Sequence, residues 1–263
     1  MSNPVGELAE RLAGRIGDFA GYRALIREIG ERRLVEGAPL LATIVARNAA
    51  FEATSSGFED VTLALEALAA LGERSAAPQI RRFLATLHLS ERAREAAIAY
   101  LAAAGDRSAA PVIARFLAQG GPRLRGAAVY ALGRLGAAAQ ADALAERLAD
   151  TAPPVARAAA LALARLGDRR GRAVLEAELA RRPAPDLVEA LAAIGDADSG
   201  VRIARLAGHP DPARRRAVAE TLADLDPDRF RRVLSRLADD PDTTVRAAAA
   251  EAPPDEPRGP SGG

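Results

Sequence analysis

The sequence predicts an all-α fold, a right-handed α-solenoid of about eight helical hairpins, and three observations support it. A glycine that ends an apolar helix recurs at intervals of 33, 31, 31, 28 and 31 residues. The closing slots are Gly72, Gly105, Gly136, Gly167, Gly195 and, in place of glycine, Asp226. Apolar residues precede each slot at helical spacing. Hydrophobic residues make up 49% of the chain but aromatic residues only 3%, which is typical of closely packed helices.

Residues 1–57 are predicted to form irregular capping hairpins. The segment IGERRLVEGAPLLATIV repeats the pattern of LGERSAAPQIRRFLA, with Gly30 and Pro39 in the places of Gly72 and Pro78. We therefore expect an N-terminal hairpin of helices 5–16 and 19–29. End repeats of solenoids are often atypical because one side faces water. Residues 53–58, ATSSGF, form the longest insertion and are predicted to be a mobile hinge.

Residues 58–251 are predicted to form the regular repeats, each a pair of helices. Proline in the first turn, as at Pro78 and Pro111, is compatible with a helix start because its missing N–H would be unpaired there. The expected pairs are 38–50 with 58–71, 75–86 with 90–104, 108–118 with 122–135, 139–149 with 153–166, 170–181 with 185–194, 198–207 with 211–225, and 228–238 with 242–251. Residues 252–263, rich in Pro and Gly, are predicted to be a disordered tail.

Two apolar columns in the second helix of each pair predict the core. The first column lies four residues before the closing slot and contains Leu68, Leu101, Leu132, Leu163, Leu191 and Leu222. The second lies directly before the slot and contains Leu71, Ala104, Leu135, Leu166, Ile194 and Leu225. A spacing of three residues places both columns on one helix face. The closing glycines suit the left-handed conformation that ends a helix.

Composition excludes several function classes. The chain has 36 basic and 35 acidic residues, so its net positive charge is too small to attract nucleic acid to the protein as a whole. It contains no Lys and no Cys, which excludes Schiff-base chemistry, thiolate nucleophiles and sulfur-ligated metals. No stretch has the ~20 apolar residues of a membrane span, and the first residues lack a secretory signal. We expect a cytoplasmic protein that binds no nucleic acid or membrane.

The segments DDPDTTVRAAAA and HPDPARRRAVAETLADL resemble HEAT repeats, in particular the short HEAT-like repeats also found in phycobilisome lyases. The resemblance covers about residues 20–251 and implies a HEAT/armadillo-like fold. The family's Asp-x-x-x-Arg step falls on Asp211 with Arg215 and on Asp242 with Arg246. Arg94 and Arg125 hold the arginine position without this Asp, while Ala156 and Ala184 depart from it. We interpret these residues as helix N-caps and a buried ladder between repeats, with ligand binding as the alternative.

The enzymatic members of this class provide alternatives. HEAT-like iron hydroxylases bind metal through His-Glu pairs, whereas this chain has only His88 and His209, followed by Leu and Pro. Alkylpurine glycosylases stack on the damaged nucleotide with Trp, which is absent here. Lyase-type repeats imply a possible role in attaching a bilin, but the match covers scaffold positions alone. We therefore assign no catalytic residue, metal or cofactor.

The solvent positions of the second helices, which line the concave side of HEAT-like arrays, provide the candidate site. Six residues before the closing slot lie Glu66, Ala99, Tyr130, Leu161, Glu189 and Glu220. Two residues before it lie Ala70, Ala103, Arg134, Arg165, Ala193 and Asp224. An exposed apolar pair beside arginines, followed by an acidic strip, is typical of a protein-binding surface, although an ordinary solvated helix face is the alternative. We assign partner binding to Tyr130, Arg134, Leu161, Arg165, Glu189, Glu220 and Asp224.

The sequence thus favours a non-catalytic scaffold or adaptor that binds a protein partner in its concave groove, as a monomer or within a hetero-complex. The alternative is a bilin lyase-like or other cofactor-attachment factor that holds a client protein in the same groove.

Overall fold

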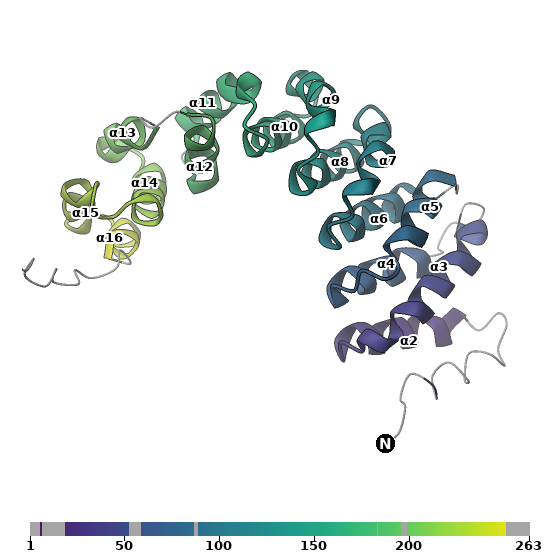
Figure 1. The fold of residues 1–263 in the computed structure, drawn as a ribbon. Helices are drawn as coiled ribbons and strands as arrows, with labels where there is room; N and C mark the ends of the chain where they lie inside the picture. Colours follow the sequence, from purple (N-terminus) through teal and green to yellow (C-terminus); the bar gives the residue numbers. More distant parts are fainter. Residues whose placement is uncertain are drawn as a thin grey trace, which may run out of the picture. The chain divides into compact units, whose positions relative to one another are not determined.

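The computed structural model describes residue 6 and residues 19–52, 59–86, 89–182, 184–195 and 199–250. Within these residues the secondary structure is helical and contains no strand (Figure 1). The chain divides into two compact units, residues 1–162 and 163–263. The expected helix at 5–16 lies almost entirely outside the described residues. The predicted hinge at 53–58 and the tail at 252–263 also lie outside them.

In the first unit, consecutive helices form antiparallel hairpins that stack in two layers (Figure 1). The second helices are packed side by side in one layer, in which α2 contacts α4, α4 contacts α6, and α6 contacts α8. This layer contains α2 (Phe19–Glu31), α4 (Asp60–Leu71), α6 (Glu91–Ala103), α8 (Pro122–Leu135) and the start of α10 (Pro153–Arg165). The first helices are α3 (Ala38–Glu52), α5 (Ala77–Thr86), α7 (Ala110–Ala114) and α9 (Ala141–Glu146).

The second unit repeats the same hairpin. Its first helices are α11 (Arg172–Arg181), α13 (Ser199–Ala204) and α15 (Arg231–Ala238). Its second helices are α12 (Pro185–Ala193), α14 (Pro212–Leu225) and α16 (Thr243–Ala250), of which α14 contacts both neighbours.

Short 3-10 turns extend several first helices of both units, at η1 (Val35–Gly37), η2 (Arg107–Ala109), η3 (Arg115–Leu117), η4 (Ala138–Gln140), η5 (Arg147–Ala149), η6 (Arg169–Gly171) and η7 (Arg205–Gly208). The predicted α-solenoid is confirmed.

The predicted core columns are buried. All six leucines of the first column are fully buried, and the second column is buried or half-buried. Each closing glycine has a positive φ, for example +66° at Gly136, as the left-handed helix ending requires. Asp226 differs, because its φ of −167° is extended backbone. It ends α14 at the predicted place, but without the left-handed turn that glycine provides.

Small residues set the distance between neighbouring second helices. A Cβ added at Gly133 of α8 would lie only 2.9 Å from the Cβ of Ala162 in α10, and one added at Gly30 of α2 would lie 3.6 Å from that of Ala67 in α4. These helices approach closely because neither side presents a larger side chain. The abundance of Ala in the sequence therefore reflects the packing of the repeats.

Candidate protein-binding surface

The exposed side chains of α8 form the centre of the predicted surface. Val129 and Leu132 are fully buried on the core side of this helix, whereas Tyr130 has 52% of its surface exposed. Arg134 lies one turn further along and is exposed, and no described residue forms a hydrogen bond or ion pair with its side chain. The helix thus presents an aromatic ring and a cation together to solvent. Val35 and Val201 are the other exposed large apolar side chains among the described residues.

Leu161 occupies in α10 the position that Tyr130 occupies in α8. The expectation of an exposed apolar pair is wrong for this member, because Leu161 is half-buried. It directly precedes Ala162, the residue of α10 that lies closest to Gly133 of α8. Tyr130, Arg134 and Leu161 therefore lie on two closely packed helices of the first unit, and the aromatic ring dominates the exposed apolar area.

The neighbouring helices frame this surface with small and charged side chains. Ala99 is exposed and Ala103 half-exposed on α6, which packs against α8, so no large side chain from α6 rises beside Tyr130 at these two positions. Further along the layer, Arg92 donates a hydrogen bond to Glu59 at 3.0 Å. Its charge is already compensated by an acidic side chain of the preceding repeat, whereas Arg134 remains available for a ligand.

The acidic residues of the predicted site belong to the second unit. Glu189 is exposed on α12, and Asp224 is exposed on α14, which packs against α12. Glu220 is half-buried and accepts a hydrogen bond from Arg216 Nε at 2.7 Å. Arg165, the last residue of α10, is exposed and also belongs to this unit. The structure thus groups Tyr130, Arg134 and Leu161 in one unit and Arg165 with the three acidic residues in the other.

The recurring Asp and Arg residues form helix N-caps at Asp211 and Asp242 and bonds between repeats at Arg125 and Arg215, as the structural interpretation predicted. Asp211 accepts the Ala213 N–H at the start of α14, and Asp242 accepts the Thr244 N–H at the start of α16. Arg215 does not pair with Asp211. Its Nε and Nη2 each donate to Asp240 of the next repeat at 2.8 Å.

Arg125 makes the equivalent two bonds, to Asp150, at 2.8 and 2.7 Å. Both acceptors are nearly buried, with 2% of the Asp150 side chain and 7% of the Asp240 side chain exposed. Hydrogen bonds from the partner arginine lower the pKa of each of these carboxyl groups. These charges are paired within the stack and hold adjacent repeats together. Asp150 and Asp240 are not among the residues predicted from the sequence, because each lies in the repeat after its arginine.

The histidines form no metal site in the described part of the chain. His88 lies outside the described residues, and His209 Nδ1 accepts the Asp211 N–H at 3.0 Å. No group of three or more His, Asp or Glu side chains among the described residues is placed to hold a metal ion. In the same residues, no helix has both the length and the hydropathy to cross a bilayer.

Comparisons with known proteins bear on the fold. A family model of HEAT repeats matches residues 82–165, 116–195 and 186–252. The chain is also similar to a chain in the complex of CpcE and CpcF of phycocyanin lyase from Nostoc sp. PCC7120, with 21% identity and a TM-score of 0.54 over 84% of this chain and 89% of that one. No curated protein matches the chain.

Two artificial proteins are similar at lower scores. An engineered protein has 18% identity and a TM-score of 0.37 over 81% of this chain and 94% of its own. A designed armadillo repeat protein has 14% identity and a TM-score of 0.35 over 81% of this chain and 98% of its own. Of these structures, the one from Nostoc supports the α-solenoid fold.

Proposed function

Because the chain belongs to the HEAT-repeat family, we propose that it is a non-catalytic scaffold whose layer of second helices binds a protein partner. The observation that carries the proposal is the exposed ring of Tyr130 beside Arg134 on α8. Tyr and Arg are the side chains most often found at the energetic centre of protein interfaces. A tyrosine that is half exposed in the free protein gains apolar contact when a partner covers it.

The surroundings of Tyr130 support a protein partner. The small residues Ala99 and Ala103 on α6 leave room for a side chain from a partner to lie against the ring. Arg134 offers a planar set of hydrogen-bond donors for a carboxylate or a backbone carbonyl. The similar chain from Nostoc is part of a two-protein complex, which is consistent with a scaffold that works together with a partner.

The decisive experiment removes the aromatic ring and reverses the neighbouring charge. The partner is first identified by affinity purification and mass spectrometry from the native host, and its affinity is then measured with purified proteins. We expect Tyr130→Ala combined with Arg134→Glu to weaken binding by about 2 kcal/mol or more, as at an interface anchor. The helical signal and melting temperature should change little, because both side chains point away from the core.

Arg107→Glu is the matched control. Arg107 is exposed on η2, at the start of a first helix, and the substitution makes the same charge reversal on the other layer of the first unit. It should leave the affinity unchanged. If the double variant keeps its partner while Arg107→Glu loses it, the partner binds on the first-helix layer and our assignment is wrong.

A second candidate function follows from the similar structure. That protein is a phycocyanin lyase, and the same surface could hold a phycobiliprotein while a bilin is attached. Incubation of the protein with bilin and apo-phycobiliprotein tests this function. Covalent attachment faster than the spontaneous reaction would establish it, and an unchanged rate would exclude it.

A further inference from the structure

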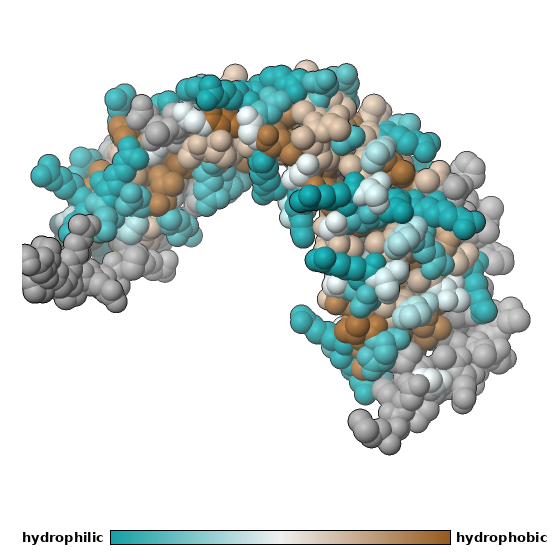
Figure 2. Space-filling model, viewed as in Figure 1, coloured by the Kyte–Doolittle hydropathy of each residue, from teal (hydrophilic) through white to brown (hydrophobic). Residues whose placement is uncertain are grey.

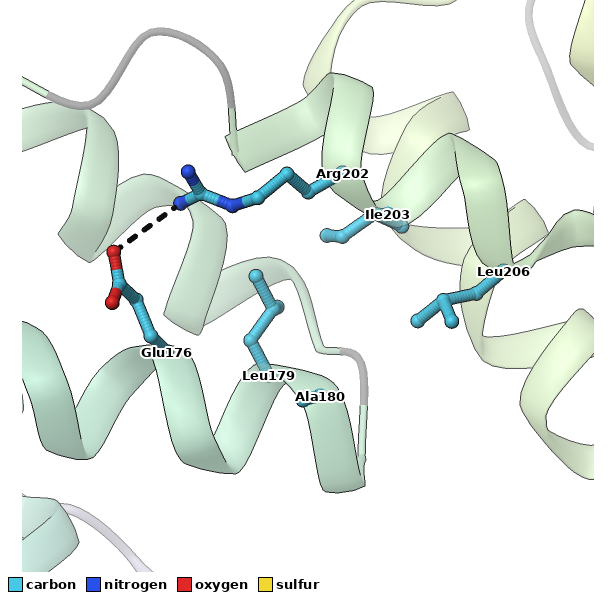
Figure 3. Close-up of a pocket in the computed structure, with 6 residues that line it drawn as sticks. All are labelled: Glu176, Leu179, Ala180, Arg202, Ile203 and Leu206. Carbon is cyan, nitrogen blue, oxygen red and sulfur yellow. Dashed lines mark ion pairs between the residues drawn. The ribbon is translucent and has the colours of Figure 1, made fainter.

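A cavity of about 340 Å³ lies between two first helices of the second unit, α11 and α13 with its extension η7. Its walls are Glu176, Leu179 and Ala180 from α11, and Arg202, Ile203 and Leu206 from α13 and η7 (Figure 3). In the view of Figure 2, hydrophobic residues are exposed between hydrophilic ones on the surface of the described helices. The cavity lies on the first helices and is therefore separate from the proposed protein-binding surface on the second helices.

The cavity has an apolar body and a charged end. Leu179, Ile203 and Leu206 project into the space between the two helices (Figure 3). Leu179 and Ile203 are buried, and Leu206 is half-buried. At the other end, Arg202 Nη2 and Glu176 Oε1 lie 3.6 Å apart. Apolar walls with a few polar groups at one end are typical of sites for small amphipathic molecules, and the volume falls within the usual range of such sites.

The cavity lies where the repeat loses a core residue. We call the position of Arg94, Arg125, Ala156, Ala184, Arg215 and Arg246 the ladder position. In four repeats the residue directly before it is apolar and buried, at Ala93, Leu124, Val155 and Val245. In α14 this residue is Arg214. Its Nη1 donates to the carbonyl of Ala180, on the cavity wall, at 3.4 Å. The side chain of Arg214 therefore reaches the edge of the cavity, but it places no apolar side chain in it.

The preceding second helix is short. α12 has nine residues, whereas α8 and α14 have fourteen. It begins at Pro185, after the ladder position at Ala184, so the helix has no residue at the core position before it. This shortening accounts for the interval of 28 residues between Gly167 and Gly195. Among the described residues directly before the ladder position, Arg214 is therefore the one that departs from a buried apolar side chain.

The helix α13 also packs closely against Phe230 and Leu225. A Cβ added at Gly200 in α13 would lie 2.7 Å from Cζ of Phe230 and 2.9 Å from a methyl carbon of Leu225. Phe230 itself is buried. These close contacts restrict the movement of α13 within the unit.

We propose that this cavity binds a small monocarboxylate with an apolar body, such as a medium-chain fatty acid. The apolar body lies among Leu179, Ile203 and Leu206, and the carboxylate accepts hydrogen bonds from the Arg202 guanidinium. A guanidinium carries five N–H donors and can bind a second carboxylate in addition to a first. Glu176 does not repel the ligand strongly, because its Oε1 already accepts from Arg172 Nε at 2.8 Å.

The test uses the full chain and sodium octanoate, with 1-octanol as the uncharged analogue of the same length. Isothermal titration should show saturable binding of one octanoate. The methyl NMR signals of Leu179 and Ile203 should shift with the same dissociation constant. Ala180→Trp places a large ring at the cavity wall and should weaken octanoate binding at least tenfold. Ala177→Trp is the control, because Ala177 is exposed on the same helix and does not line the cavity.

The role of Arg202 is tested separately. Arg202→Gln should weaken octanoate about tenfold and leave 1-octanol unchanged, since only the charged ligand uses the guanidinium. Arg205→Gln, an exposed arginine on η7 outside the cavity, should bind both ligands as the wild type does. The proposal is overturned if octanoate shows no saturable binding, or if the two tryptophan variants bind it equally. Equal effects of Arg202→Gln on both ligands would overturn the carboxylate assignment.

Discussion

The contact between Gly133 and Ala162 allows a stability prediction of unusual sign. Alanine normally stabilises the interior of a helix relative to glycine, by about 1 kcal/mol. At Gly133 of α8, however, the new methyl would lie 2.9 Å from Ala162 Cβ and 3.1 Å from Ala162 Cα. Ala162 is in the interior of α10 and has no flexible side chain that could move aside, so one of the two helices must shift.

The magnitude follows from two opposing terms. Inserting a methyl group into a packed interface typically costs about 1 to 3 kcal/mol, and the upper part of this range applies where backbone must move. Subtracting the gain in helix propensity of about 1 kcal/mol leaves a net loss of about 1 to 2 kcal/mol for Gly133→Ala. The same shift would separate the helices that carry Tyr130 and Leu161, so partner binding should weaken as well.

Gly126, in the same helix, provides the matched control. The nearest atom to a Cβ added there is Val155 Cγ2, at 4.0 Å, which is an ordinary contact. Gly126→Ala should therefore stabilise the protein by up to about 1 kcal/mol. Urea unfolding of both variants, followed by circular dichroism, measures the two effects. If Gly133→Ala stabilises the protein as Gly126→Ala does, the close approach of α8 and α10 is absent and the reasoning is refuted.

Other substitutions test the helix ends and the ladder. Gly136→Val should cost about 1 to 2 kcal/mol in urea unfolding through its positive φ alone, since no atom lies within 4 Å of the added Cβ; an unchanged midpoint would contradict this. Because Arg215 lowers the pKa of Asp240, the carboxylate stabilises the fold fully above about pH 4, its unfolded pKa, and loses this effect as pH falls through the folded pKa. Unfolding midpoints of Asp240→Asn should therefore depend less on pH below 4 than those of the wild type. Arg81→Glu should lower the melting temperature, because Arg81 donates to Asp106 of the next repeat at 2.7 Å.

The helical hairpins could be predicted from the sequence because their signals are local. A closing glycine, an apolar residue every three or four positions and a proline in the first turn all lie within one helix or its ends. The buried Leu132 and the left-handed Gly136 are examples, and both are found as expected. The exposure of Tyr130 was equally predictable, because it lies on the opposite side of α8 from Leu132.

The ladder partners could not be read from the same signals. Asp150 and Asp240 are separated from their arginines by a loop and a whole first helix, so no helical periodicity connects the two. Comparing the same position in different repeats gives a weak indication of the pairing. The position that corresponds to these aspartates after Arg94 is Gln119, and Arg94 instead lies over the ring of Phe116 at 6.0 Å. The corresponding residue is thus aspartate after Arg125 and Arg215 but not after Arg94, and only the structure identifies the pairs.

The cavity between α11 and α13 shows why departures from the repeat carry information that the repeat itself does not. In a solenoid each repeat contacts only its neighbours, so stability is approximately a sum of repeat and interface terms. One interface can therefore remain incompletely filled while the others keep the chain folded. The short interval before Gly195 and the arginine at position 214 marked such an interface in the sequence. Whether the space was closed depended on the position of α13, which packs closely against Phe230 at Gly200. A ligand that fills this interface should stabilise the second unit, and the stabilisation should rise with the logarithm of the ligand concentration once this exceeds the dissociation constant, whereas a partner on α8 should leave that interface unchanged.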